Sequence, residues 1–170
     1  MITVEDYFKE ERECTYKGEV YSVRDNGAVM RHSREGKRLR KNDDVWTFGK
    51  TDERTGYNII GTERVHLIVA YAFLGEPPTN QHVVDHIDTN RQNNRPENLR
   101  WLTRLENALL NPITRAKIEN ICGSIEAFIN DPTILPLPKF GVMAVIEEGM
   151  TYHASALKHL KIISRDLSAR

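Results

Sequence analysis

The sequence has few cysteines, no long hydrophobic run and no excess of either charge. Its two cysteines, Cys14 and Cys122, are too few for a zinc ribbon and do not indicate a disulfide framework, which favours a reducing compartment. The apolar run at residues 67–74 is far shorter than the roughly 20 residues that cross a bilayer. The acidic N-terminus contains no apolar signal segment. We therefore expect a soluble, cytoplasmic protein without a membrane partner.

The net charge of zero hides a segregated charge pattern. The 24 basic and 24 acidic residues cancel over the whole chain. Residues 17–42, however, carry 8 basic and 3 acidic side chains, a net of +5, and residues 151–170 carry a net of +3. Residues 1–13 and 43–63 each carry a net of −3. A basic segment of this kind is either a solvated loop or a surface for phosphate, so neutrality does not exclude a nucleic-acid partner.

The first third of the chain has the pattern of a small antiparallel sheet. Alternating residues at 20–24, the turn Asp25-Asn26-Gly27 and the apolar residues 28–30 predict a β-hairpin. Further strands are expected at 44–48 and 56–60, the latter ending in a turn at 61–62.

The middle of the chain has the pattern of a helix followed by two short strands and a second helix. Helical spacing predicts a helix over 65–73, ended by Gly75. Strands are expected at 81–87 and 98–102, joined by a polar loop. Thr103 and Glu106 have the spacing of a capping box, so a helix should begin after Thr103 and should end or restart at Pro112. Residues 113–130 have helical periodicity, 131–138 resemble a linker, and 141–165 are periodic again.

The segment 85–107 contains residues that suit phosphodiester hydrolysis. A histidine such as His86 has the reference pKa needed to deprotonate a water near neutral pH. A hard cation such as Mg²⁺ takes oxygen ligands, and Asp85 and Asn107 supply a carboxylate and an amide oxygen. Simple strand alternation would direct Asp85 and His86 to opposite faces, which is a difficulty for a shared site.

The same segment resembles the HNH nucleases, and within them the phage and intron-encoded homing endonucleases. The resemblance lies in His-Ile-Asp-Thr-Asn at 86–90, in the run from Asn93 to Thr103, and in Glu-Asn-Ala at 106–108. It extends upstream through Arg64-Val65-His66, and residues 15–62 look like the modular DNA-binding domain that often precedes this core. The resemblance implies an α+β fold, with a small antiparallel β-sheet module followed by a ββα-metal (HNH) nuclease core and C-terminal helices.

The resemblance also implies roles for four residues. Asp85 matches the first metal ligand and Asn107 the second, and the cation would be Mg²⁺ or Mn²⁺. His86 matches the general base, and Asn98 matches the asparagine that holds the loop in shape and helps to orient that base. In many members the last position is histidine, so this chain is an H-N-N variant. The family geometry implies that Asp85 and His86 converge, and that hydrolysis leaves a 5′-phosphate and a 3′-hydroxyl.

Two further departures from the family pattern are visible. Thr89 stands where the family usually has glycine, which affects the turn of the loop. Leu67 replaces an arginine that often follows His66, so one basic contact is missing. Without context Asp85 and His86 would be a structural ion pair, but together with Asn98 and Asn107 they favour catalysis. His66 alone is better explained as structural, and side chains of Asp88 and Asn90 are expected to shape the turn.

The basic residues near these motifs are candidate contacts to double-stranded DNA, largely through phosphates. They are Arg31, Arg34, Lys37, Arg38, Arg40, Lys41, Arg91, Arg95, Arg100 and Arg104. We expect residues 1–63 to be a β-rich DNA-binding module, 64–112 the nuclease core, and 113–170 a helical extension that could also bind DNA.

The prediction is a metal-dependent HNH endonuclease in the cytoplasm of a bacterial or phage-infected cell. Two alternatives remain open, a non-catalytic DNA-binding relative and a restriction or phage-packaging nuclease on the same core. The sequence leaves open whether the protein acts as a monomer or a homodimer, and whether one DNA strand or both are cut.

Overall fold

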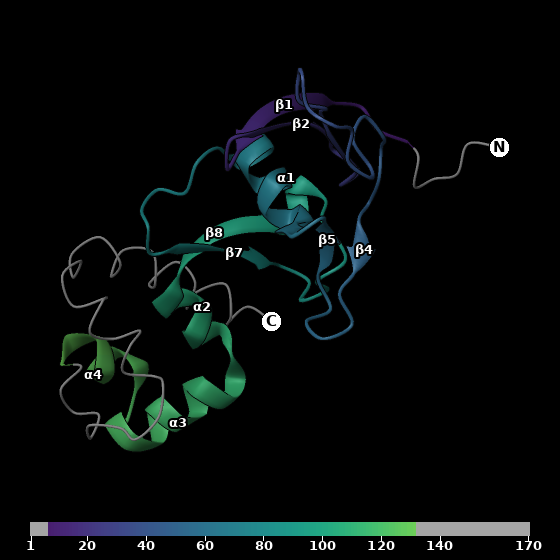
Figure 1. Ribbon diagram of the computed structural model, residues 1–170. Helices are drawn as coiled ribbons and strands as arrows, with labels where there is room; N and C mark the ends of the chain where they lie inside the picture. The colour runs from purple at the N-terminus through teal and green to yellow at the C-terminus, as the bar shows by residue number, and fades with distance from the viewer. Residues whose placement is uncertain (1–6, 132–170) are drawn as a thin grey trace. The chain divides into compact units, whose positions relative to one another are not determined.

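The computed structural model describes residues 7–131 and divides the chain into two compact units (Figure 1). The first unit comprises Met1–Asn80 and Val84–Trp101, and the second comprises Gln81–Val83 and Leu102–Arg170. Small antiparallel sheets and helices give the α+β class that the sequence predicts. The domain limits at residues 63 and 112 stay a prediction, and the expected linker at 131–138 and helices at 141–165 fall almost wholly outside the described residues.

The first unit begins with the predicted hairpin, extended to three strands. Strand β1 (Glu11–Tyr16) pairs antiparallel with β2 (Glu19–Arg24), which pairs antiparallel with β3 (Val29–Arg31). The β2–β3 turn contains Asn26-Gly27, as predicted, and Gly27 has a φ of +90°, a conformation that favours glycine.

A second three-stranded sheet follows, formed by β4 (Lys50–Thr51), β5 (Asn58–Ile60) and β6 (Glu63–Arg64). The strand expected at 44–48 is wrong, because that segment forms only a single bridge from Thr47 to Val29. The physical reason lies in its start: Asp44 has a φ of +57°, in the left-handed region, which interrupts an extended strand.

Helix α1 (Val65–Leu74) carries no charged residue and packs into the core of the first unit. It lies against the first sheet in Figure 1. A helix that is apolar all round is expected to be buried, and Val65, Ile68 and Val69 are fully enclosed. The helix begins and ends as predicted, with Gly75 at a φ of +80° after its last turn. Its position matters for the site because its first turn holds His66.

The predicted pair of short strands consists of β7 (His82–His86) and β8 (Leu99–Thr103). A polar loop joins them and ends in the 3₁₀ helix η2 (Pro96–Asn98). Leu99 is buried in the same core as α1, so the ends of both strands near this loop are fixed to the first unit.

The second unit contains helices α2 (Arg104–Leu110), α3 (Pro112–Cys122) and α4 (Ile125–Asn130). Thr103 and Glu106 form the predicted capping box, and α3 restarts with Pro112 in its first turn. The single helix expected at 113–130 is interrupted at Gly123, which has a φ of +83°. Leu109, Ile118 and Phe128, one from each of these three helices, form the core of the second unit. None of the helices within residues 7–131 is long and apolar enough to span a membrane.

Candidate active site

His86 lies at the end of β7 and is only 5% exposed. Its Nε2 lies 3.0 Å from the side-chain oxygen Oδ1 of Asn94. Because an amide oxygen can only accept, Nε2 must donate, and this fixes the neutral ring in the tautomer with a lone pair on Nδ1. The arrangement therefore leaves Nδ1 as the nitrogen that can take a proton.

Asn94 is the residue that sequence analysis missed. It is 4% exposed and lies in the loop, eight residues after His86. A Cβ atom added to Gly27 would lie 3.1 Å from the backbone of Asn94, so the β2–β3 turn packs closely against this residue. Neither contact leaves a periodic signal in the sequence. The histidine contact depends on the conformation of the loop, and the glycine contact depends on how a distant turn packs against that loop.

Asn98 holds the loop between β7 and β8. Its side-chain oxygen accepts from the backbone N–H of Asp88 at 3.0 Å, and its Nδ2 donates to Asp88 at 2.9 Å and to the Asn93 carbonyl at 2.8 Å. The predicted turn bonds are confirmed, since Asp88 and Asn90 both accept from backbone N–H groups two residues on. Hydrogen bonds from Asn93 and Asn98 lower the pKa of Asp88, although exposure keeps the effect small in free energy. Asn98 makes these contacts within the loop, and the side chain bonded to the His86 ring is that of Asn94.

Thr89 has a φ of +64°, in the left-handed region that a β-branched residue rarely adopts. The glycine that the family pattern has at this position therefore suits the backbone better than threonine does. We expect Thr89→Gly to raise the free energy of unfolding by about 1 kcal/mol, because the strain removed exceeds the extra entropy of the unfolded chain. Urea unfolding would measure it. Thr62→Gly is the control, at a threonine without positive φ, and it should lower the stability of the protein. A loss of stability in Thr89→Gly would contradict the proposal that the Thr89 backbone is strained.

Asp85 faces β8 and binds Arg100. Both the Nε and a terminal nitrogen of Arg100 lie 2.9 Å from the Oδ2 atom of Asp85. Within the described part of the chain its second oxygen, Oδ1, has no hydrogen bond. Asp85 and His86 thus have different partners, in line with strand alternation, and their convergence stays a prediction. A carboxylate oxygen fits a hard divalent cation that accepts few protein ligands.

Asn107 lies on the exposed side of α2, in the second unit. The capping box at Thr103 places it one turn into the helix. No group of three or more His, Cys, Asp or Glu side chains suited to a metal occurs within residues 7–131. The proposed ligand pair, one carboxylate and one amide, belongs to a different type and stays a prediction.

The predicted DNA contacts include two side chains that are bound within the fold. Arg31 is 8% exposed and donates to Asp43 at 2.6 Å. Arg40 binds Asp43 at 3.1 Å and both carboxylate oxygens of Glu19. Burial alone would raise the pKa of Asp43, but hydrogen bonds from Arg40 and Arg31 lower it to about 2. These contacts hold the loop between β3 and β4, and contact of Arg31 and Arg40 with DNA stays a prediction.

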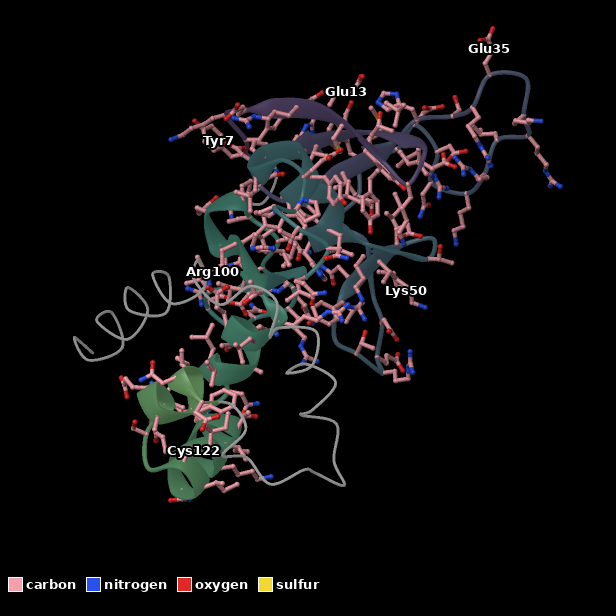
Figure 2. All side chains as sticks on the ribbon, turned by 90° about the vertical axis from the view of Figure 1, so that its left-hand side faces the viewer. Tyr7, Glu13, Glu35, Lys50, Arg100 and Cys122 are labelled. Atoms are coloured by element: carbon pink, nitrogen blue, oxygen red, sulfur yellow. The ribbon has the colours of Figure 1, made fainter. Side chains whose placement is uncertain are left out.

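The exposed members of the set remain candidate DNA contacts. Lys37, Arg38 and Lys41 are exposed on that loop, whose projecting tip carries Glu35 (Figure 2). None of the three has an ion pair within residues 7–131. Two of the other arginines have acidic partners: a terminal nitrogen of Arg34 lies 3.6 Å from a carboxylate oxygen of Glu19, and Arg100 binds Asp85. Arg95 is half-buried, whereas Arg91 and Arg104 are exposed. Contact of these side chains with DNA stays a prediction.

A buried histidine, His66, packs against His86. It is 3% exposed, its ring centroid lies 5.0 Å from that of His86, and the Tyr57 ring lies 4.7 Å away on another side. Its Nδ1 is the single buried side-chain nitrogen or oxygen between residues 7 and 131 that lacks a hydrogen bond. Burial, and then the nearby charges of His86 and Arg64, lower the pKa of His66 to about 3. His66 is therefore a neutral neighbour of His86 near pH 7.

The depressed pKa of His66 makes folding sensitive to mild acid. Below the unfolded value of about 6.5 the unfolded chain binds a proton that the folded protein does not, so stability falls as pH falls. With a folded pKa of about 3, the loss between pH 7 and pH 5 should be about 2 kcal/mol. Denaturant unfolding at both pH values would measure it. His66→Phe keeps a ring without a titrating group and should lose most of this difference; an unchanged difference would contradict the assignment.

Known proteins are similar to the segment of this chain that contains His66, Asp85 and His86. Residues 63–109 match the family model described as HNH endonuclease. An uncharacterised HNH endonuclease of Acanthamoeba polyphaga mimivirus is 40% identical over 57 residues, which is 34% of this chain and 17% of that protein. A solved structure on DNA binding and cleavage by the HNH homing endonuclease I-HmuI is 28% identical and covers 59% of this chain and 60% of its own, with a TM-score of 0.34. This chain thus spans less than two thirds of either relative.

Proposed function

We propose that this chain, whose residues 63–109 match the HNH endonuclease family model, is a metal-dependent endonuclease that hydrolyses phosphodiester bonds of double-stranded DNA. The observation that carries the proposal is the hydrogen bond from His86 to Asn94 within the matched segment. It holds a histidine in one tautomer and leaves Nδ1 available, which is what a general base requires.

Each proposed catalytic residue has one task. His86 takes a proton from the attacking water through Nδ1. Asn94 holds the His86 ring, and Asn98 holds the loop that carries Asn94. Asp85 and Asn107 would bind the divalent cation, Mg²⁺ or Mn²⁺. When bound, that cation stabilises negative charge on the phosphate and on the leaving 3′ oxygen. The products would carry a 5′-phosphate and a 3′-hydroxyl.

The neutral His66 supports this role of His86. A protonated neighbour 5.0 Å away between ring centroids would repel the positive charge that His86 acquires when it accepts a proton. Because burial keeps His66 neutral, the charge on His86 meets no opposing histidine charge. The two histidines, His66 and His86, are thus suited to hold one added proton between them rather than two.

The proposal is tested by incubating supercoiled plasmid with the purified protein and Mg²⁺, with an EDTA control. We expect nicked or linear DNA that depends on the cation. Nicking alone would indicate action on one strand, and linear product would indicate cleavage of both. Binding without cleavage under all divalent cations would instead support the non-catalytic DNA-binding alternative. We further propose that the protein acts in the cytoplasm of a bacterial or phage-infected cell. Localisation of the protein by microscopy would test this proposal.

A further inference from the structure

Tyr57 holds two exposed guanidinium groups over its ring. The Cζ atom of Arg64 lies 4.6 Å from the ring centroid, and that of Arg91 lies 5.0 Å from it. Arg91 also donates to the carbonyl oxygen of Thr55 at 2.6 Å. Cation–π stacking and this backbone hydrogen bond fix both side chains without neutralising either charge.

No carboxylate pairs with either guanidinium within residues 7–131. The carboxylate of Asp52, on the loop that leads to Tyr57, accepts from the hydroxyl of Thr55 and from the backbone N–H of Arg54. Hydrogen bonds from these groups lower the pKa of Asp52, with a smaller effect from the charge of Arg64. Two exposed positive charges therefore share one tyrosine ring, and neither has an ion-pair partner within residues 7–131.

The same tyrosine ring contacts the proposed catalytic histidine. Its centroid lies 5.9 Å from that of His86 and 4.7 Å from that of His66. One tyrosine ring thus contacts both guanidinium groups and the proposed catalytic histidine. Successive phosphates of one DNA strand are only about 3.4 Å apart along the helix axis, so an anion bound here would belong to the strand near His86.

We propose that Arg64 and Arg91, held by Tyr57, bind a backbone phosphate of the DNA strand that His86 attacks. The planar guanidinium fork matches phosphate oxygens in pairs, and stacking on an aromatic ring orders the fork before DNA arrives. Arg64 was not among the contacts expected from the sequence, because its position over Tyr57 depends on the packing of β5 beside α1. The inference rests on the proposed nuclease function.

The test measures DNA affinity of the full chain in a His86→Ala background, with EDTA, so that no cleavage occurs. Arg64→Ala and Arg91→Ala should each weaken binding of a short duplex by about tenfold and reduce the salt slope by about one. Arg54→Ala is the matched control, since it removes an arginine from the loop that carries Tyr57, and Arg54 has no aromatic ring contact among residues 7–131. It should change affinity less than twofold. Equal losses in all three variants would overturn the inference, because they would reflect net charge alone.

The tyrosine supplies an independent test of the positioning. Tyr57→Phe keeps the ring and should keep affinity, whereas Tyr57→Leu should lose about as much as one arginine variant. Thermal melting of each variant checks folding, and Arg91→Lys, which keeps the charge but loses the fork, should lose affinity in part. Normal affinity in a folded Tyr57→Leu would overturn the inference. A wild-type protein that binds in this pattern but never cleaves would overturn the nuclease proposal alone.

Discussion

His86→Ala should reduce plasmid cleavage by about 10²- to 10⁴-fold, the usual contribution of a general base. The ring is buried and hydrogen-bonded to Asn94, and the substitution removes the proposed base from that position. Binding of DNA and of the cation should persist, because the proposed contacts for both lie on other side chains. The measurement is initial cleavage rate at saturating Mg²⁺, with DNA binding followed separately.

Two further variants separate catalysis from folding in that experiment. His32→Ala is the matched control, since His32 is half-buried and, like His86, has a hydrogen-bonded ring, but its partner is Ser22 outside the site. Its cleavage rate should stay within about twofold. Asn94→Ala should reduce cleavage less than His86→Ala does, because the base remains but its tautomer and orientation are no longer fixed. Undiminished cleavage by a folded His86→Ala protein would sink the assignment of the base.

Asp85→Ala should lose the Mg²⁺-dependent cleavage by about three orders of magnitude, since a bound cation stabilises the transition state by several kcal/mol. Asp85 is the charged member of the proposed ligand pair, and Asn107 alone provides one neutral oxygen. The measurement is the cleavage rate as Mg²⁺ is titrated, together with cation binding by calorimetry. We expect both signals to disappear in the variant.

The loss of Asp85 also leaves Arg100 without its partner, and this needs its own control. The double variant Asp85→Ala/Arg100→Ala removes both members, and its cleavage should be as low as that of the single variant. The pair is partly exposed, so its loss should cost at most about 1 kcal/mol of stability. Glu97→Ala, at an exposed acid of the neighbouring turn, should cleave normally. Retained cation dependence in Asp85→Ala would contradict its role as ligand.

The elements that the sequence predicted correctly have local signals. The Asn26-Gly27 turn, the apolar helix α1 and the capping box at Thr103 each depend on residues within a few positions of one another. The errors arose where a local backbone conformation intervened. Positive φ at Asp44 and at Gly123 interrupts the strand and the helix that the apolar pattern favoured.

The site shows the same division between local and long-range information. The motif residues from Asp85 to Asn98 could be identified by their spacing, and the loop bonds of Asp88 follow from it. The contact of His86 with Asn94 could not, because it depends on the exact conformation of the loop, and the stacking of Tyr57 with His66 could not, because it joins segments that pack together only in the fold. Burial of Arg31 against Asp43 was equally hidden, since a basic run has no sign of which charges are already paired.

The central claim is that this chain uses His86 and a divalent cation to hydrolyse DNA. The most direct test maps the ends produced from a long DNA duplex by the wild-type protein and by His86→Ala, each with Mg²⁺ or with EDTA. We predict cuts by the wild-type protein with Mg²⁺ alone, whose ends carry a 5′-phosphate and a 3′-hydroxyl and can be rejoined directly by DNA ligase. Cuts that persist in EDTA or in folded His86→Ala, or no cuts under any divalent cation, would contradict the account.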